Sequence, residues 1–505
     1  MNRPMKSAYK FTRSLVTAAV LAIASGCVAP KPGPLPSAVA PLPDRFPGTE
    51  GTTNAVVIGW REYFQDPVLI SLISTALTNN QELNILMQEV AVAKAETDAR
   101  RGALFPFLRL GGTAGVDKVS VNSRNGAVEE NLEIQPGKKF PDPLPTYGVA
   151  ADLDWEIDIW KKLRNERDAA IQRYLATQEG RNFMVTHLVA EISETYYDLL
   201  SLDGQLAIYR RMLEMQEKAL ESVRIKKSAA RVTELAVRRF EAEVSKNRSK
   251  LFAIQQQIIE NENRLNVLTG RYPQPIERSP DGFEIRMLSP LQTGVPSELL
   301  RHRPDVRQAE LELKAAGLEV MVAAARFYPA MNVSAVLGIE SFTLGSPILA
   351  KENLAYGATA NLVGPLINRS AIKAAFKGAS AHQVAAVYRY QQTVLKAYVE
   401  VVNALSQVRN VGQGYELKSR QVEALSDAAT MSSQLFNSAR ADYTEVLLTQ
   451  REALESRVEL VEMKQIQLMA AVKAYKALGG GVPDSRDYSA TTPKATVKAT
   501  GRPKS

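Results

Sequence analysis

The chain has 505 residues, of which 45% are hydrophobic and 23% charged, as in an ordinary folded protein. Its net charge of +8 is concentrated at the two ends, with four basic residues among the first thirteen and a net +4 in residues 485–505. The remainder is close to neutral and has no basic stripe interleaved with aromatic residues, which argues against nucleic-acid binding.

The first 27 residues have the pattern of a lipoprotein signal peptide. A basic stretch precedes an apolar run from Leu15 to Ala24, which is shorter than the roughly 20 residues needed to span a bilayer. The run ends at Ala24-Ser25-Gly26-Cys27, where Cys27 is the only cysteine. This segment resembles the lipobox of bacterial lipoproteins, in which the cysteine becomes the first residue and is acylated. We therefore expect a covalent lipid on Cys27 and no other cofactor. Cys27 is followed by Val28. An Asp at that position would resemble an inner-membrane retention signal, so the Val favours the outer membrane.

An internal duplication occupies most of the chain, between a proline-rich tether (27–54) and a basic, disordered tail (482–505). Residues 83–106 recur 223 positions later, and residues 151–153 recur 209 positions later. We place the first repeat at 55–270, a linker at 271–299 and the second repeat at 300–481. The first copy has about 14 extra residues, assigned to a loop at 122–146 because Asn125-Gly126 and several prolines are typical of loops.

Each repeat is predicted to contain two strands and two long helices. A first helix begins near Asp66-Pro67, since Asp suits an N-cap and proline the first helical position. Alternating and β-branched residues predict strands at 107–119, 146–154, 331–341 and 354–363. Long helices are expected at 158–228, 234–270, 368–438 and 442–479. A helix of 70 residues spans about 100 Å, more than an ordinary globular core requires.

Apolar residues recur every seven positions in the last helix of each copy. The two series are Val244, Leu251, Ile258, Leu265 and Leu454, Val461, Leu468, Tyr475. A seven-residue period is typical of helices that supercoil left-handedly against neighbours. We expect Gly270 and Gly480 to end these two helices.

Four strands cannot close a barrel around a pore, and open sheet edges cannot face lipid. The predicted strands must therefore be buried or completed by other chains, and three chains would supply twelve. Strands of about 9–11 residues are long enough to cross a bilayer.

Several short motifs occur in the order and at the spacing found in one family. Trp155-Glu156-Ile157-Asp158 resembles the WELD motif of TolC/NodT-type outer-membrane efflux lipoproteins, and Arg303-Pro304-Asp305-Val306 resembles their RPDV motif. Further matches are Trp60, Phe64-Gln65-Asp66-Pro67, Leu69, Ala76-Leu77, Asn79-Asn80, Leu104-Phe105-Pro106, Ala309-Glu310, Gly364-Pro365-Leu366-Ile367 and the closing Ala477-Leu478-Gly479-Gly480-Gly481. Together they cover residues 55–482.

The resemblance implies a mainly α fold with a β-barrel part. A homotrimer would form a 12-stranded outer-membrane barrel above a periplasmic α-helical tunnel. The implied function is a passive outer-membrane channel that carries drugs or toxic compounds out of the cell. The implied partners are a periplasmic adaptor and an inner-membrane pump, commonly of the resistance–nodulation–division type. Most motif residues are expected to act structurally, by packing and capping.

The turns between the long helices would lie farthest from the membrane, where a partner would dock and a gate would close. The candidate residues are Ala230, Arg231, Thr233, Glu234, Arg440, Asp442 and Tyr443. The family has a glycine in each turn, whereas this chain has Ala230 and Ala439, and alanine disfavours a left-handed conformation. Arg440 and Asp442 are candidates for ion pairs between subunits that hold the tips closed.

Nothing in the sequence favours catalysis. The three histidines, His187, His302 and His382, are scattered, and there is no metal-ligand spacing, nucleophile elbow or phosphate loop. Two alternatives to efflux remain: the outer channel of a type I protein secretion system, and a periplasmic coiled-coil scaffold without a pore.

Overall fold

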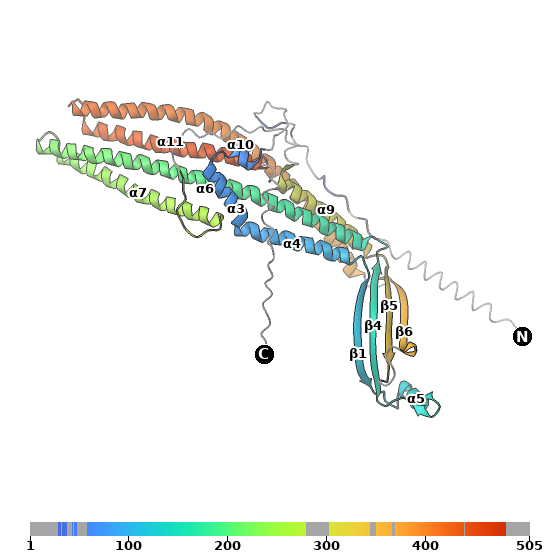
Figure 1. The fold of residues 1–505 in the computed structure, drawn as a ribbon. Coiled ribbons are helices and arrows are strands. Elements are labelled where there is room, and N and C mark those ends of the chain that lie inside the picture. Colours follow the sequence, from blue (N-terminus) through green and yellow to red (C-terminus); the bar gives the residue numbers. More distant parts are fainter. Residues whose placement is uncertain are drawn as a thin grey trace, which may run out of the picture. The chain divides into compact units, whose positions relative to one another are not determined.

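The structure is a computed structural model that describes residues 29–31, 33–37, 43, 45–47, 58–278, 302–343, 350–365, 369–438 and 440–480. The predictions for the signal peptide with Cys27, for most of the tether and linker, for Ala439 and for the tail lie outside these residues. The described chain consists of long helices and a four-stranded sheet (Figure 1). None of the described helices is both long and apolar enough to cross a membrane.

The two repeats share one order of elements: a helix, two strands and two long helices. The first contains α2 (Trp60–Tyr63), α3 (Pro67–Asn79), α4 (Gln81–Gly102), β1 (Phe107–Asp117), β4 (Leu144–Ile157), α6 (Lys162–Ser228) and α7 (Glu234–Leu268). The second contains α9 (Pro304–Ala325), β5 (Ala330–Ser341), the 3-10 turn η1 (Lys351–Asn353), β6 (Leu354–Val363), α10 (Ser370–Asn437) and α11 (Tyr443–Ala477). The Asp66 carboxylate caps α3 as expected, accepting the N–H of Val68 at 2.9 Å.

The connection between β1 and β4 is not the loop that the sequence suggested. It contains a short helix, α5 (Arg124–Asn131), and a small hairpin of β2 (Glu133–Gln135) and β3 (Lys138–Lys139). Asn125-Gly126 lies in the first turn of α5, because Ser123 acts as its N-cap and accepts the N–H of Gly126 at 3.1 Å. The cap therefore outweighs the turn preference of the Asn-Gly pair.

The main sheet is antiparallel throughout, in the order β1-β4-β5-β6. Each repeat contributes one pair of adjacent strands, and β4 and β5 join the two pairs. The sheet therefore has β1 and β6 as its edges, and within the described residues each edge strand pairs with only one neighbour.

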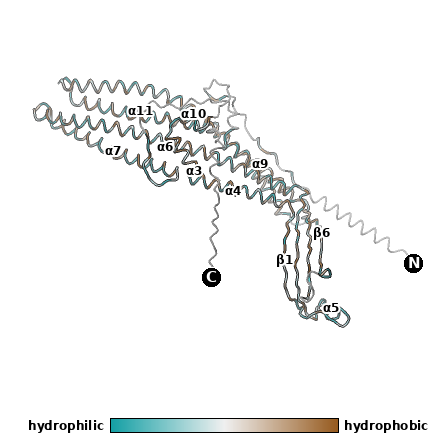
Figure 2. Tube along the Cα trace, viewed as in Figure 1, coloured by the Kyte–Doolittle hydropathy of each residue, from teal (hydrophilic) through white to brown (hydrophobic). Residues whose placement is uncertain are grey.

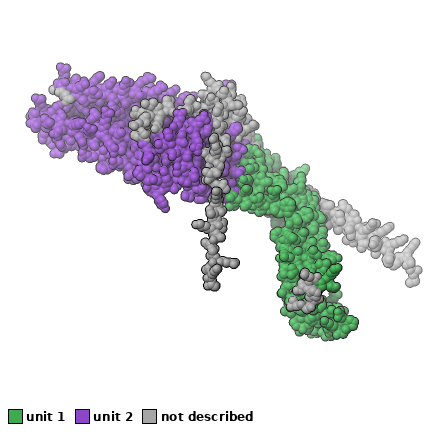
Figure 3. Space-filling model, in the orientation of Figure 1, with its two compact units in different colours: residues 1–38, 91–175, 310–388 green, residues 39–90, 176–309, 389–505 purple. Residues whose placement is uncertain are grey.

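The chain divides into two compact units that do not coincide with the repeats (Figure 3). One unit comprises residues 1–38, 91–175 and 310–388 and contains the sheet and the helical segments next to it. The other comprises residues 39–90, 176–309 and 389–505 and contains the helical hairpins. Each unit combines parts of both repeats, so neither repeat is a compact body by itself.

The helical unit has a core built from the seven-residue pattern. Val244, Leu265, Leu454, Val461, Leu468 and Tyr475 are all buried, whereas Leu251 and Ile258 are half-buried. The hairpin of α6 and α7 lies beside that of α10 and α11 (Figure 1), where Met212 packs against Leu454 and Val458. The predicted seven-residue period thus identifies the helix faces of α7 and α11 that are buried in this core.

Glycine ends both heptad helices, but in α11 one residue earlier than expected. Gly270 has φ +68, and the N–H of the next residue reaches back to Asn266, which is the Schellman arrangement. In α11 the equivalent position is Gly479, with φ +99, and the N–H of Gly480 reaches back to Tyr475. The prediction that Gly480 takes this place was therefore wrong by one residue.

Candidate functional site: the sheet and the helical tips

One face of the sheet is apolar. The register places Leu110, Ala151, Leu337 and Tyr356 in one row, so their side chains share this face. The same alternation adds Leu108, Ala114, Val116, Val149, Leu153, Val333, Ala335, Ile339, Leu354, Ala358, Ala360 and Leu362. Leu110 and Tyr356 are each 80% exposed, as expected for an uncovered face. Hydrophobic positions recur along the strands in Figure 2. An apolar surface of this extent is suited to contact with lipid.

The opposite face carries most of the polar residues of the sheet, together with Phe107, Leu144, Val336 and Val363. Its rows include Arg109 beside Asp152, and Arg109 forms an ion pair with Asp154. The face also carries Thr113, Asp117, Thr146, Glu156, Asn332, Ser334, Glu340, Thr359 and Asn361. Between these lie small residues such as Gly111, Gly148, Ala150 and Gly338. A sheet that is apolar on one face and polar on the other has the pattern of a membrane barrel strand set, with lipid outside and water inside.

The sheet is crowded on its polar face. Gly338 pairs with Ala150, and a Cβ placed on Gly338 would lie 2.7 Å from the Cβ of Ala150 and 2.6 Å from the carbonyl oxygen of Val149. Directly opposed Cβ atoms in an antiparallel pair are ordinarily about 4.5–5.5 Å apart. Side chains converge on the concave side of a curved sheet, so this crowding indicates that the polar face is the inner one.

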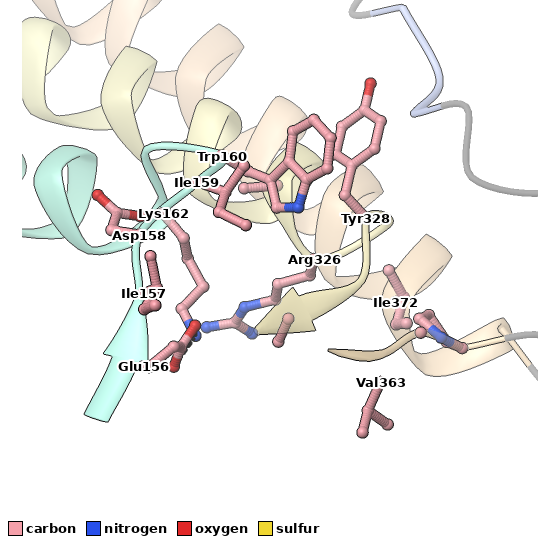
Figure 4. A pocket seen from close by; sticks show the side chains of 14 residues that line it. Glu156, Ile157, Asp158, Ile159, Trp160, Lys162, Arg326, Tyr328, Val363 and Ile372 are labelled. Carbon is pink, nitrogen blue, oxygen red and sulfur yellow. Dashed lines mark hydrogen bonds and ion pairs between the residues drawn. The ribbon is translucent and has the colours of Figure 1, made fainter. Parts of the chain in front are cut away.

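Two tryptophans form hydrogen bonds to the helix-to-strand junctions that precede β1 and β5. The indole N–H of Trp155 donates to the carbonyl of Leu104 at 3.1 Å, and that of Trp160 donates to the carbonyl of Pro329 at 2.8 Å. Each bond therefore holds the junction that precedes the first strand of one repeat. Trp160 also stacks on Tyr328, with ring centroids 4.7 Å apart (Figure 4). The sequence motif directed attention to Trp155 but not to Trp160.

Acidic residues of the same motif fix the start of α6. The carboxylate of Asp158 accepts the backbone N–H groups of Leu163 at 3.1 Å and Arg164 at 3.0 Å. Burial raises the pKa of Asp158, but the hydrogen bonds from Arg164 and the backbone outweigh burial and hold the pKa below its usual value. Lys162 reaches Glu156 at 2.6 Å beside a pocket of about 370 Å³ (Figure 4). Packing and capping thus account for this motif.

The first tip turn retains the left-handed conformation although it lacks glycine. Ala230 has φ +55. Its N–H donates to Lys227, and the N–H of Arg231 donates to Lys226, both at 2.9 Å, so the turn is a Schellman motif with alanine at the left-handed position. Ala230, Arg231, Thr233 and Glu234 are all exposed. The first tip is therefore exposed in the single chain.

The second tip shares one backbone hydrogen bond with the first and packs against it. The N–H of Arg440 donates to Leu435 at 2.8 Å, matching the bond made by Arg231. Arg440 and Asp442 are exposed, but Tyr443 is half-buried and packs, with Phe436, against the cluster around Val223 and Phe240. The structure therefore brings the two tips together and uses Tyr443 in their packing.

Charged residues of the first tip form ion pairs within the chain. Glu234 pairs with Lys227 at 2.5 Å and with Arg238 at 2.9 Å. The hydrogen bond and charge of Lys227 lower the pKa of Glu234, so this carboxylate stays ionised into the acidic range. In the second tip, neither Arg440 nor Asp442 forms an ion pair within the described residues. Asp442 instead caps α11, accepting the N–H of Tyr443 at 2.7 Å.

Replacing Ala230 with glycine is expected to stabilise the first tip by about 0.5–1 kcal/mol. A left-handed conformation costs an L-residue about 1–2 kcal/mol, and the greater freedom of glycine in the unfolded chain offsets part of this. Hydrogen exchange of the tip amides should therefore slow. Ala229→Gly is the control, because Ala229 has no positive φ and its replacement should speed exchange. Equal changes in both variants would contradict this account.

The described residues do not contain a group of three or more His, Cys, Asp or Glu side chains placed to hold a metal ion. The Nδ1 of His187 lies 3.7 Å from a carboxylate oxygen of Glu191, one helical turn away. The prominent sites of the chain are therefore the two-faced sheet and the helical tips.

Known proteins resemble this chain in sequence. A sequence profile of the outer membrane efflux protein family matches residues 72–271 and 295–480. The chain is 28% identical over 424 residues to the pyoverdine export outer membrane protein OpmQ of Pseudomonas putida, covering 84% of this chain and 88% of that protein. It is 25% identical over 478 residues to the probable outer membrane lipoprotein SilC of Salmonella typhimurium, covering 93% and 99%.

The fold is also that of a solved outer-membrane channel. The open state of the MtrE outer membrane channel of Neisseria gonorrhoeae matches with a TM-score of 0.78 at 23% identity, over 90% of this chain and 98% of that one. The family profile covers well over half of the sequence, and it includes both strand pairs and all four long helices. The chain therefore belongs to the outer membrane efflux protein family.

Proposed function

We propose that the chain forms, as a homotrimer, the passive duct of a tripartite efflux system. As a family member it is an outer-membrane efflux protein. The observation that carries the proposal is the sheet, because one chain supplies an apolar face, a polar face and two open edges. Since open edges cannot face lipid, the sheet needs further copies, and three supply twelve strands. Energy for transport then comes from the partner pump.

The partners in this proposal are a periplasmic adaptor and an inner-membrane pump of the resistance–nodulation–division type. The adaptor docks on the two tips. The exposure of Arg231, Thr233 and Arg440 supports this assignment, because these side chains are available for contact. A photo-crosslinker at Thr233, with mass spectrometry of the product, should capture such an adaptor. Capture of the adaptor of a secretion ATPase would instead favour protein export.

The proposed anchor is a lipid on Cys27, which lies outside the described residues. Two or more acyl chains on one residue would hold the protein stably, whereas a single chain binds weakly. Cys27→Ser should lose the incorporation of labelled fatty acid. Continued labelling of that variant would overturn the assignment.

Conductance tests the duct itself. The full-length protein, extracted from outer membranes in mild detergent, should run as a heat-sensitive trimer and produce discrete current steps in planar bilayers. Heated, monomeric protein from the same preparation is the control and should be silent. A trimer that inserts without conducting would contradict the duct and favour a scaffold without a pore.

Gating at the second tip can be separated from helix capping. Asp442→Ala removes both the charge and the cap of α11, and a lost cap costs about 1 kcal/mol. Asp442→Asn keeps an acceptor for the N–H of Tyr443 and removes only the charge. If Arg440 and Asp442 pair between subunits, Asp442→Asn and Arg440→Gln should both raise the entry of a large antibiotic into cells.

The control for this prediction is Glu445→Gln, which removes an exposed acid of the same helical turn. Its permeability should equal that of the parent. An increase with Asp442→Ala alone would assign the effect to fraying of α11, and the gating pair would be wrong.

A further inference from the structure

One side chain of the proline-rich tether is buried against the folded part of the chain. Phe46 is the only aromatic residue between Cys27 and Trp60. Its side chain is 2% exposed, whereas its neighbours Arg45 and Pro47 are exposed. A side chain in a solvated linker would remain in water, so the tether has at least one fixed point at Phe46.

The seat that receives Phe46 is formed by one face of α10 and one face of α11. Tyr398 of α10 stacks on the Phe46 ring, with centroids 5.4 Å apart and planes 22° apart. Side chains three residues apart lie on the same face of a helix. Each helix contributes such a pair of buried residues, and three of the four are alanines that leave room for a ring: Val401, Ala404, Ala474 and Ala477.

The seat is also held together without the tether. The carbonyl of Ala477 accepts a hydrogen bond from the Arg303 guanidinium at 2.9 Å, and the same guanidinium pairs with Glu400 of α10 at 2.7 Å. Arg303 therefore joins α10 to α11 beside the Phe46 ring. Since this contact does not involve the tether, we expect the two helices to keep their pairing when Phe46 is replaced.

The bond between Arg45 and Phe46 gives a direct measure of whether the ring is seated. Before Arg61 the tether has two basic residues, Lys31 and Arg45, and trypsin does not cleave after Lys31 because Pro32 follows it. A protease must draw the residues on both sides of the cut bond into its active site. Exposed, loosely held segments meet this requirement, but a bond next to a buried ring does not.

We propose that Phe46 is a latch that docks the tether on α10 and α11 and so shields the Arg45–Phe46 bond from proteases. The consequence rests on the lipid anchor proposed above, because a cut at this bond would separate acylated Cys27 from both repeats. Burial of a phenylalanine side chain favours the seated state by about one to two orders of magnitude in the equilibrium constant. Cleavage then proceeds only from the small unseated fraction.

Trypsin digestion of the full-length protein in mild detergent tests the latch, with mass spectrometry to follow the cut after Arg45. Phe46→Ala should speed this cut by about tenfold or more, because the unseated state becomes the common one. Phe46→Leu fills part of the seat and should give an intermediate rate. Tyr398→Ala leaves the tether sequence intact and should also speed the cut.

Matched variants of α10 separate the seat from general effects on the helix. Tyr398→Phe keeps the stacked ring and should be cut at the parental rate. Tyr388→Ala removes an exposed ring of the same helix and should also behave as the parent. Arg45→Gln should abolish the product, which identifies the bond. The heat-sensitive trimer should persist in every variant.

Each contrary outcome counts against a defined part of the proposal. A parental rate in Phe46→Ala would overturn the latch. A parental rate in Tyr398→Ala, together with a faster cut in Phe46→Ala, would place the seat elsewhere than on α10. Faster cutting throughout the helices of Phe46→Ala would assign the effect to a loosened fold. Labelled fatty acid is followed separately, so a protein that shows the protected bond without the label would overturn only the anchor.

Discussion

Replacing Arg303 with alanine is expected to lower the free energy of unfolding by about 3 kcal/mol, the lower end for breaking a buried ion pair. Arg303 is 3% exposed. Its guanidinium donates to both carboxylate oxygens of Asp305, at 3.0 and 2.7 Å, to Glu400 at 2.7 Å and to the carbonyl of Ala477 at 2.9 Å. One side chain thus joins the start of α9, α10 and the end of α11.

Two further variants separate charge from geometry in this cluster. Arg303→Lys keeps the charge but cannot make the forked contact with Asp305, so an intermediate loss is expected. Lys314→Ala on the same helix removes an exposed pair with Glu310 and should cost no more than about 0.5 kcal/mol. Denaturation of the detergent-solubilised protein, followed by circular dichroism, measures all three. Equal losses for Arg303→Ala and Lys314→Ala would contradict the structural role of Arg303.

The helical part of the fold follows closely from local sequence signals. A long helix is specified by its own residues, and the heptad positions Leu454, Val461 and Leu468 identify its buried face. Observed bounds such as Lys162–Ser228 differ from the expected 158–228 by a few residues at one end. The difference arises because Trp160 and Lys161 belong to a capped junction, in which Lys161 has φ +60.

The sheet was foreseen as strands, but its order and curvature were not. The period-two pattern locates each strand, whereas the contact of β4 with β5 joins residues far apart in the sequence, such as Tyr147 and Ser341, which are 194 positions apart. No local signal encodes such a contact. Once the register is known, however, the apolar row through Leu110 and Leu337 can be read directly from the alternation in the sequence.

Six of the seven candidate tip residues are exposed and Tyr443 is half-buried, and their roles in docking and gating stay predictions. Asp442 was expected to act through an ion pair, and within one chain it caps α11. Tyr443 was expected as a contact for a partner, yet its ring packs on the neighbouring hairpin. Both roles depend on the direction in which the side chain leaves a short turn. The amino-acid composition of the turn does not determine that direction.

Gly338→Ala is expected to prevent most of the protein from reaching its assembled form. Its new Cβ would lie 2.6 Å from a backbone oxygen and 2.7 Å from the Cβ of Ala150, so the pairing of β4 with β5 must open. Overpacking of this kind costs about 1–3 kcal/mol or more. The heat-sensitive trimer in outer-membrane fractions measures the outcome, and its yield should fall severalfold. Gly102→Ala, outside the sheet, is the control, because a Cβ on Gly102 has no atom within 4 Å in the chain.

A second-site change distinguishes crowding from a general intolerance of the sheet. Ala150→Gly removes one of the two atoms that the new methyl group would meet, whereas the carbonyl oxygen of Val149 remains. The double variant Ala150→Gly with Gly338→Ala should therefore recover only part of the lost trimer. Full assembly of Gly338→Ala alone would mean that the sheet is flatter than it is here. The assignment of the polar face as the inner, concave one would then lose its main support, because that assignment depends on the crowding at Gly338.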